Sequence, residues 1–329
     1  MIKALVIHGN DRHTYRLCQS LQLCGVEVRV ATEYKDIPRD KCDIIFVDPS
    51  FPKDPTPKIN SDLVCFYDCE DAPTDYELGV AFEAMKNSVS YYCKMNWVGD
   101  SFKGIKLIGF PIASMLTLPP VANVDLPEFA HSNAIPFFAG TGTFIGDYTP
   151  TSKGVYQSIE NINCLGECAG RTMYNQRIDW LLSMQNSNIP YVGGLVFKGD
   201  NLSEEWQSEH FGKGVSTLRT DPLDRNQFFS HLFNYRIGLN PTGHDRNSWR
   251  IYDLMAAGCI LFSTDLKGQQ ALYMPKEIIT VEDGEDLGAT LLTLQPDFKE
   301  LWKAHQCNRN VIKDLTPEKV WGDFMEQFK

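Results

Sequence analysis

The stretch that most constrains the fold is residues 235–264, YRIGLNPTGHDRNSWRIYDLMAAGCILFST. Short apolar runs at 236–240 and 259–262 predict two buried strands. The residues between them predict a loop and then a helix that starts near 247–248 and ends at Gly258. A strand, a loop, a short helix and a strand form a βαβ unit, whose ligand crevice lies at the carboxyl end of the first strand.

The loop and the first helical turn carry groups suited to an anionic ligand. Free N–H groups at a helix N-terminus bind phosphate, and His244, Arg246 and Arg250 add donors around the same point. Asp253 lies three residues beyond Arg250 on the same helix face, where a carboxylate can accept hydrogen bonds from a sugar diol. The alternative is that Arg250 and Asp253 form a surface ion pair on an ordinary crossover helix.

The same stretch resembles a glycosyltransferase signature. Asp245-x7-Asp253, followed by LMAAG, is similar to the Glu-x7-Glu signature of GT-B glycosyltransferases of the group 1 type, with Asp at both acidic positions. RNSWRIYDLMAAGCILFSTD most resembles the spore-maturation (CgeB-like) and exostosin-like branches. The resemblance implies that Asp253 holds the ribose of a nucleotide sugar and that Asp245 lies near the donor sugar. It also implies that Arg246 or Arg250 meets the diphosphate.

Strands alternate with helices along most of the chain, which predicts a doubly wound, parallel α/β sheet. A proline-rich stretch at 111–136 is typical of a linker, and 329 residues are enough for two domains. With the resemblance, we expect two Rossmann-like domains facing across a cleft: an acceptor-binding domain at 1–130 and a nucleotide-sugar-binding domain at 131–315. A final helix at 316–329 is expected to cross back onto the first domain, with Trp321, Phe324 and Phe328 as its apolar face.

The second domain is expected to open with a strand at 137–139 and a loop of small and hydroxyl residues that can line a diphosphate pocket. The predicted nucleotide-sugar site therefore has two parts, one in this loop and one in the central βαβ unit. Its residues are Gly140, Thr141, Gly142, Thr143, Gly243, His244, Asp245, Arg246, Asn247, Ser248, Trp249, Arg250 and Asp253.

Two residues of the first domain are candidates for the catalytic base, because each follows a predicted strand. His8 and Asp71 join Asp245 and Arg250 as the predicted catalytic residues. The alternatives are that His8 is a hydrogen-bonded turn histidine and that Asp71 is the N-cap of a helix at 75–86.

Composition limits the partners. A net charge of −11 argues against a large non-specific nucleic-acid surface, although DNA is not excluded as an acceptor. The ten cysteines show no regular framework and predict reduced thiols in a cytoplasmic protein. No signal peptide or membrane span is expected.

The sequence therefore predicts a glycosyltransferase that moves a sugar from a nucleoside diphosphate sugar to a hydroxyl acceptor on a glycan, a small molecule or a protein. Because arginines and helix N–H groups can neutralise the departing diphosphate, we expect no metal and no cofactor. Three alternatives stay open: a DNA-base glucosyltransferase, a nucleotide-sugar epimerase, and a nucleotide-sugar-binding module without catalysis. The sequence leaves open the sugar, the stereochemistry, the oligomeric state and the role of residues 147–171.

Overall fold

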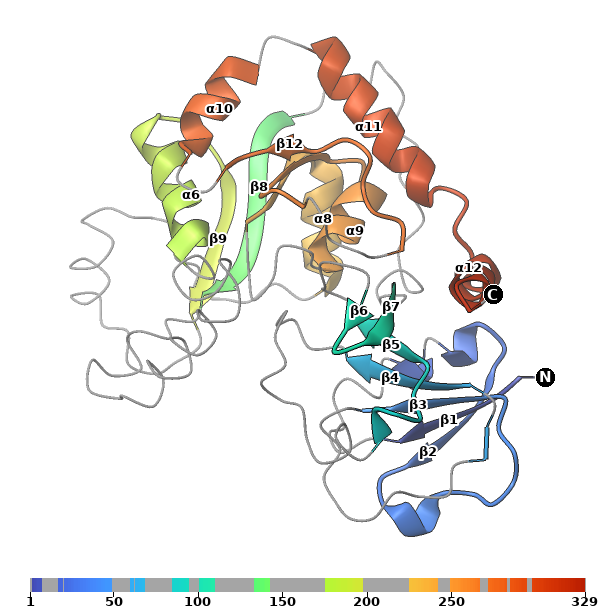
Figure 1. The fold of residues 1–329 in the computed structure, drawn as a ribbon. Helices are drawn as coiled ribbons and strands as arrows, with labels where there is room; N and C mark the ends of the chain where they lie inside the picture. The colour runs from blue at the N-terminus through green and yellow to red at the C-terminus, as the bar shows by residue number, and fades with distance from the viewer. Residues whose placement is uncertain are drawn as a thin grey trace, which may run out of the picture. The chain divides into compact units, whose positions relative to one another are not determined.

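The computed structural model divides the chain into two units, each compact in itself (Figure 1). Unit 1 comprises Met1–Leu118, Lys267–Met274 and Asp314–Lys329, and unit 2 comprises Pro119–Leu266 and Pro275–Lys313. The residues that the structure describes are 2–7, 17–19, 21–48, 60–61, 63–68, 85–94, 101–109, 133–142, 175–197, 225–241, 249–266, 272–282, 285–294 and 298–328.

Unit 1 is built on a seven-stranded sheet with the order β2-β1-β3-β4-β5-β7-β6. All neighbouring strands pair in parallel except the short β6, which is antiparallel to β7. The strands are β1 (Lys3–Ile7), β2 (Glu27–Ala31), β3 (Ile44–Val47), β4 (Val64–Asp68), β5 (Tyr91–Lys94), β6 (Ser101–Phe102) and β7 (Ile105–Gly109).

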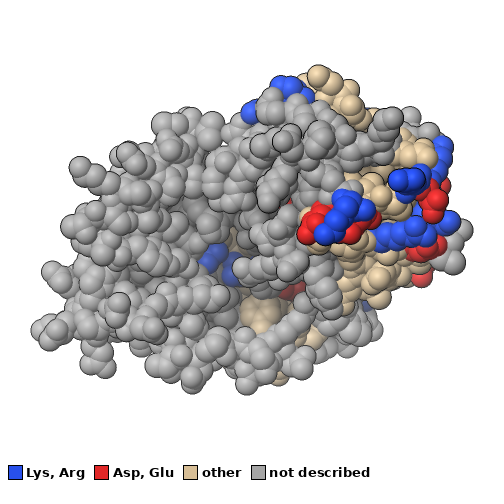
Figure 2. Space-filling model, turned by 90° about the horizontal axis from the view of Figure 1, so that it is seen from below, with Lys and Arg blue, Asp and Glu red and all other residues tan. Residues whose placement is uncertain are grey.

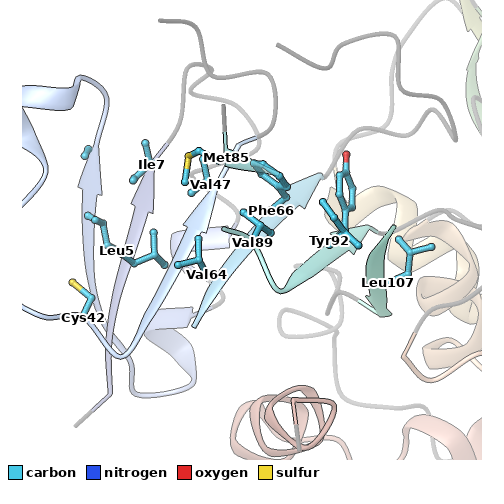
Figure 3. Close-up of a cluster of buried hydrophobic side chains, with 13 residues drawn as sticks. Leu5, Ile7, Cys42, Val47, Val64, Phe66, Met85, Val89, Tyr92 and Leu107 are labelled. Atoms are coloured by element: carbon cyan, nitrogen blue, oxygen red, sulfur yellow. The ribbon is translucent and has the colours of Figure 1, made fainter. Parts of the chain in front are cut away.

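Both faces of this sheet are apolar, as expected for a parallel sheet. Along β1 the side chains alternate between two separate core clusters: Leu5 and Ile7 belong to one, and Ala4 and Val6 to the other. Figure 3 shows the first cluster, in which residues from successive strands line up across one face of the sheet. The central strands therefore read as continuous hydrophobic runs in the sequence.

The C-terminal helix α12 (Pro317–Glu326) packs on the second of these faces, which confirms the predicted return to the first domain. Phe324 is fully buried and stacks on Phe46 of β3, with ring centroids 6.2 Å apart. Beyond the helix, the Gln327 amide donates to the Gly109 carbonyl at 3.0 Å and accepts from the Gly109 N–H at 2.9 Å. Of the three predicted contact residues, Trp321 and Phe324 lie in this cluster and Phe328 packs against it.

Unit 2 contains a five-stranded, wholly parallel sheet with the order β12-β11-β10-β8-β9. Its strands are β8 (Asn133–Gly142), β9 (Val192–Phe197), β10 (Tyr235–Asn240), β11 (Ile260–Ser263) and β12 (Ile279–Thr280). Its helices are α6 (Asn175–Asn186), α8 (Arg225–Asn234), α9 (Trp249–Ala256), α10 (Leu287–Leu294) and α11 (Phe298–Ile312). This confirms the doubly wound α/β class.

The order of the unit 2 strands reverses between β8 and β10, since the chain runs from β8 outward to β9 and then returns past β8 to β10. In open parallel sheets, ligands bind in the crevice outside the carboxyl ends of the strands at such a reversal. A ligand site of unit 2 is therefore expected at the carboxyl ends of β8 and β10.

Two details differ from the sequence prediction. Residues 140–142, predicted as a loop, are the last residues of β8, where Gly140 pairs with Leu195 and Gly142 with Phe197 of β9. Glycine is depleted in strands, so its presence favoured a loop prediction, but pairing with β9 decides the conformation. The second difference is the β6–β7 hairpin, which was not predicted; its turn has Lys103 at φ 46° and Gly104 at φ 85°.

Within the described ranges, no helix is both long enough and apolar enough to cross a membrane.

Helix α9 approaches β10 closely at Gly238. A Cβ added there would lie 2.3 Å from Leu254 Cδ2 and 3.1 Å from Cys259 Cβ. We therefore expect Gly238→Ala to lower the free energy of unfolding by roughly 1–3 kcal/mol, measured by denaturant unfolding. Gly322→Ala in α12 is the matched control, because a methyl there meets nothing within 4 Å and should add up to about 1 kcal/mol of helix stability. Equal losses in both variants would show that crowding at Gly238 is not the cause.

Candidate functional site

The candidate site lies at the carboxyl edge of the unit 2 sheet, around the ends of β8, β10 and β11. β10 ends at Asn240, which is followed by the buried Pro241, and α9 begins at Trp249. The predicted strand, helix and second strand of this unit are all present. Residues 242–248 lie outside the described residues.

Helix α9 is almost entirely buried, including its two charged residues. Arg250 is 7 % exposed and Asp253 is 1 % exposed. This burial excludes the alternative in which they form a surface ion pair. Buried charges are costly unless other groups compensate them, so an Arg and an Asp on one buried crossover helix make this helix a candidate site.

The C-terminal end of α9 is fixed by a left-handed glycine, as predicted. Gly258 has φ 78°, its N–H donates to Met255 O at 3.1 Å, and the Cys259 N–H donates to Leu254 O at 2.9 Å. These two bonds form the Schellman motif that turns the chain directly into β11.

A histidine of α11 completes this end of the helix. The Gly258 carbonyl lies 2.9 Å from His305 Nδ1, and because a carbonyl only accepts, Nδ1 carries the proton. His305 is 1 % exposed and stacks on Trp302 of the same helix, with ring centroids 5.1 Å apart. The pKa of His305 is lowered to about 4, chiefly by burial and also by the positive charges of Arg236 and Arg309, against the opposing effect of the Gly258 hydrogen bond.

Sequence reasoning missed His305 and the polar residues at the end of β11. Ser263 and Thr264 are 0 % and 1 % exposed, and Asp265 is half-buried. Asn240 Nδ2 donates to Ser263 Oγ at 2.9 Å, which joins the ends of β10 and β11. The available signal was the change from an apolar run to the polar pair Ser263-Thr264 directly after CILF.

The structure places only some of the predicted site residues. Arg250 and Asp253 lie on one helix at the edge of the sheet, and Trp249 is its first residue. Gly140, Thr141 and Gly142 lie at the end of β8, beside β10 in the sheet. The other predicted residues lie outside the described residues: His8, Asp71, Thr143, Gly243, His244, Asp245, Arg246, Asn247 and Ser248.

Unit 1 has the same reversal of strand order, between β1 and β3. Asp48 directly follows β3 at this point, and its N–H donates to Ile7 O at 2.9 Å. Asp48 therefore lies at the carboxyl end of the strands at this reversal, where open parallel sheets bind ligands. In the part of the chain that the structure describes, no three His, Cys, Asp or Glu side chains group as metal ligands would.

Sequence comparisons identify no relative. No protein-family model matches the chain, and no curated protein matches it.

Comparison with solved structures does find similar folds over almost the whole chain. A trehalose-6-phosphate protein from E. coli, bound with UDP-2-fluoro glucose, is similar at TM-score 0.53 with 10 % identity, covering 99 % of this chain and 98 % of that one. An alpha-glucosyltransferase in complex with UDP and a 13-mer DNA is similar at TM-score 0.53 with 11 % identity and the same coverages. The N-terminal domain of Candida albicans trehalose-6-phosphate phosphatase is similar at TM-score 0.51 with 9 % identity, covering 99 % and 88 % of the two chains.

The chain therefore has the GT-B glycosyltransferase fold, as its central motif predicted. At these identities the likeness concerns the fold, and function must be argued from the site.

The buried His305 predicts a dependence of stability on pH. Its pKa of about 4 in the folded chain lies below the ordinary 6.5, so between these values the unfolded chain binds a proton that the folded chain does not. The free energy of unfolding should therefore fall as pH drops from about 6.5 to 4, by up to about 3 kcal/mol from this residue. His305→Asn keeps an N–H at the position of Nδ1 for Gly258 but does not titrate, so urea unfolding across this range should show a smaller loss. Parallel losses in the two proteins would contradict the assignment.

Proposed function

We propose that this protein is a glycosyltransferase that moves a sugar from a nucleoside diphosphate sugar to a hydroxyl acceptor. The observation that carries the proposal is the burial of Arg250 and Asp253, three residues apart on α9, beside the strand reversal of a GT-B unit. The proposal assigns both residues to the donor.

The electrostatics of α9 favour an anion at its start. The first turn holds Arg250 and no acidic residue, so a cation lies where the helix dipole is already positive. A diphosphate suits this end of the helix, because it accepts the two parallel hydrogen bonds of a guanidinium and those of the helix N–H groups.

Two structures of the same fold support the choice of ligand. One is bound with UDP-2-fluoro glucose and the other with UDP. By this analogy Asp253, one turn further into α9 than Arg250, accepts hydrogen bonds from the ribose hydroxyls.

In the proposed reaction the bond between the anomeric carbon and the diphosphate oxygen breaks, and a bond to the acceptor oxygen forms. Arg250, with Arg246 and the helix N–H groups, stabilises the charge that develops on the departing diphosphate. Asp245 lies near the donor sugar, and His8 or Asp71 takes the proton of the acceptor hydroxyl. The roles of these last three residues and of Arg246 rest on the motif resemblance and the strand order.

The charge distribution favours an acceptor other than nucleic acid. The net charge is −11, and described residues of both signs lie side by side on the face drawn in Figure 2. Arg29 Nη2 lies 3.7 Å from Glu27 Oε1, and Arg29 Nη1 lies 3.8 Å from Asp40 Oδ2. A DNA-base glucosyltransferase needs phosphate-binding cations, so the alpha-glucosyltransferase that was solved with DNA is a weaker guide to the acceptor than to the fold.

We infer a reducing, cytoplasmic compartment from the cysteines. Cys65 of β4 is buried, as are Cys42 and Cys259, which lie just before β3 and β11. Burial raises the pKa of the Cys259 thiol to about 12, so it remains protonated and unreactive toward disulfide exchange.

Arg250 and Asp253 are tested by nucleotide binding. We expect one nucleoside diphosphate or its sugar conjugate to raise the thermal midpoint of the wild type. At a hundred times its Kd, the ligand should add about 2.7 kcal/mol to the free energy of unfolding. Arg250→Lys and Asp253→Asn keep side-chain size and should abolish most of this increase, because each removes a charge-assisted or bidentate contact. Ile251→Val, a buried change on the same helix, should lower the starting midpoint yet leave the ligand-induced increase intact.

Nucleotide binding together with product analysis separates the transferase from an epimerase and from a binding module. Binding with transfer to a hydroxyl acceptor supports the transferase, and epimerised donor without acceptor indicates an epimerase. Binding without turnover indicates a nucleotide-sugar-binding module, and no midpoint increase with any nucleotide rejects the donor site.

Metal independence is tested by chelation. Because Arg250 and the helix N–H groups are proposed to neutralise the diphosphate, turnover should be unchanged after EDTA treatment and dialysis. Loss of turnover with EDTA and its return with Mg²⁺ or Mn²⁺ would show that a divalent ion has this role instead.

A further inference from the structure

A buried polar pair joins the two strands that flank α9. Asn240 and Ser263 are the last residues of β10 and β11 and lie directly opposite each other in the parallel register. Both are 0 % exposed. Asn240 Nδ2 donates to Ser263 Oγ at 2.9 Å, and Ser263 Oγ donates to Asn240 O at 3.4 Å.

Stability alone does not account for polar residues at these positions. The preceding residues on the same face of the two strands are Gly238, which packs against Leu254 of α9, and Leu261, which is 1 % exposed. A buried amide–hydroxyl pair loses its hydration on folding, so its net contribution is close to that of a well-packed apolar pair. The pair instead restricts the relative position of the two strand ends, because hydrogen bonds are directional and apolar contacts are not.

The strand ends that it fixes are those from which the candidate site is built. Pro241 starts the segment that leads to α9, and Thr264 starts the segment that leaves β11; both residues are buried. The Ser263 carbonyl also accepts from the Val281 N–H at 2.9 Å, which ties the end of β11 to the residue that follows β12.

We propose that Asn240 and Ser263 are positioning residues of the nucleotide-sugar site. Their two hydrogen bonds hold the carboxyl ends of β10 and β11 at the spacing that the donor requires. The inference rests on the proposed function for the identity of the ligand, but not for the geometry of the strand ends.

The test separates position from stability. Ser263→Ala leaves the Asn240 amide without this acceptor, and Asn240→Leu/Ser263→Ala replaces the pair by an apolar one. Ile260→Val, which removes one buried methyl from β11, is the matched control. Three quantities are measured for each protein: the thermal midpoint, the Kd for the nucleotide found above, and hydrogen exchange of peptides covering 264–266 and 249–256.

We expect the double variant to recover the midpoint lost by Ser263→Ala. Its nucleotide Kd should nevertheless stay at least tenfold weaker than that of the wild type, and exchange at 264–266 should be faster. Ile260→Val should lower the midpoint without changing the Kd. A double variant with wild-type Kd and wild-type exchange would overturn the proposal, because the pair would then be only structural.

The two proposals fail in different ways. If the wild type binds no nucleotide, the proposed function fails, and exchange in the unliganded proteins still decides whether the pair positions the strand ends. Faster exchange at 264–266 in the stable double variant supports positioning, and unchanged exchange rejects it.

Discussion

The candidate site depends on the close packing of α9 against β10. Gly238 provides the space, since any Cβ there would collide with Leu254 of the helix. The result is a helix whose residues 250–256 are all buried, with Arg250 and Asp253 inside the protein rather than at its surface. Charges in such surroundings interact more strongly than they do in water. Packing at one glycine thus sets the electrostatic environment of the site.

Apolar and polar contacts have different effects in this βαβ unit: the apolar contacts stabilise it, and the polar contacts orient its ends. Ile237, Leu239 and Phe262 supply the burial that holds the layers together. Directional hydrogen bonds are found at the two ends: His305 to the Gly258 carbonyl at one, and Asn240 to Ser263 at the other. Hydrophobic burial is non-directional, so it stabilises the unit without fixing small displacements. The polar contacts limit such displacements at the strand and helix ends, where a ligand of the candidate site would bind.

Sequence reasoning recovered what depends on local pattern. The apolar runs located β10 and β11, and Gly258 located the end of α9, because a left-handed C′ residue favours glycine on local grounds. Sequence reasoning failed where contacts between residues far apart in the sequence determine the local structure. The end of β8 is a strand because β9 pairs with it, and His305 acts on a carbonyl 47 positions away in the sequence. Local propensity has no access to such partners.

The two departures from the signature that the sequence resembles, Asp245 and Asp253, leave the fold intact. The fold is similar to that of structures at about 10 % identity over almost the whole chain, because a pattern of burial is enough to specify it. An Asp in place of Glu at position 253 shortens the reach of the carboxylate by one methylene. In the proposed donor site, a ribose on Asp253 would therefore lie closer to α9 than one on Glu. The position of the helix would then affect donor binding, so the contacts that fix α9 would matter as much as the residues that it presents.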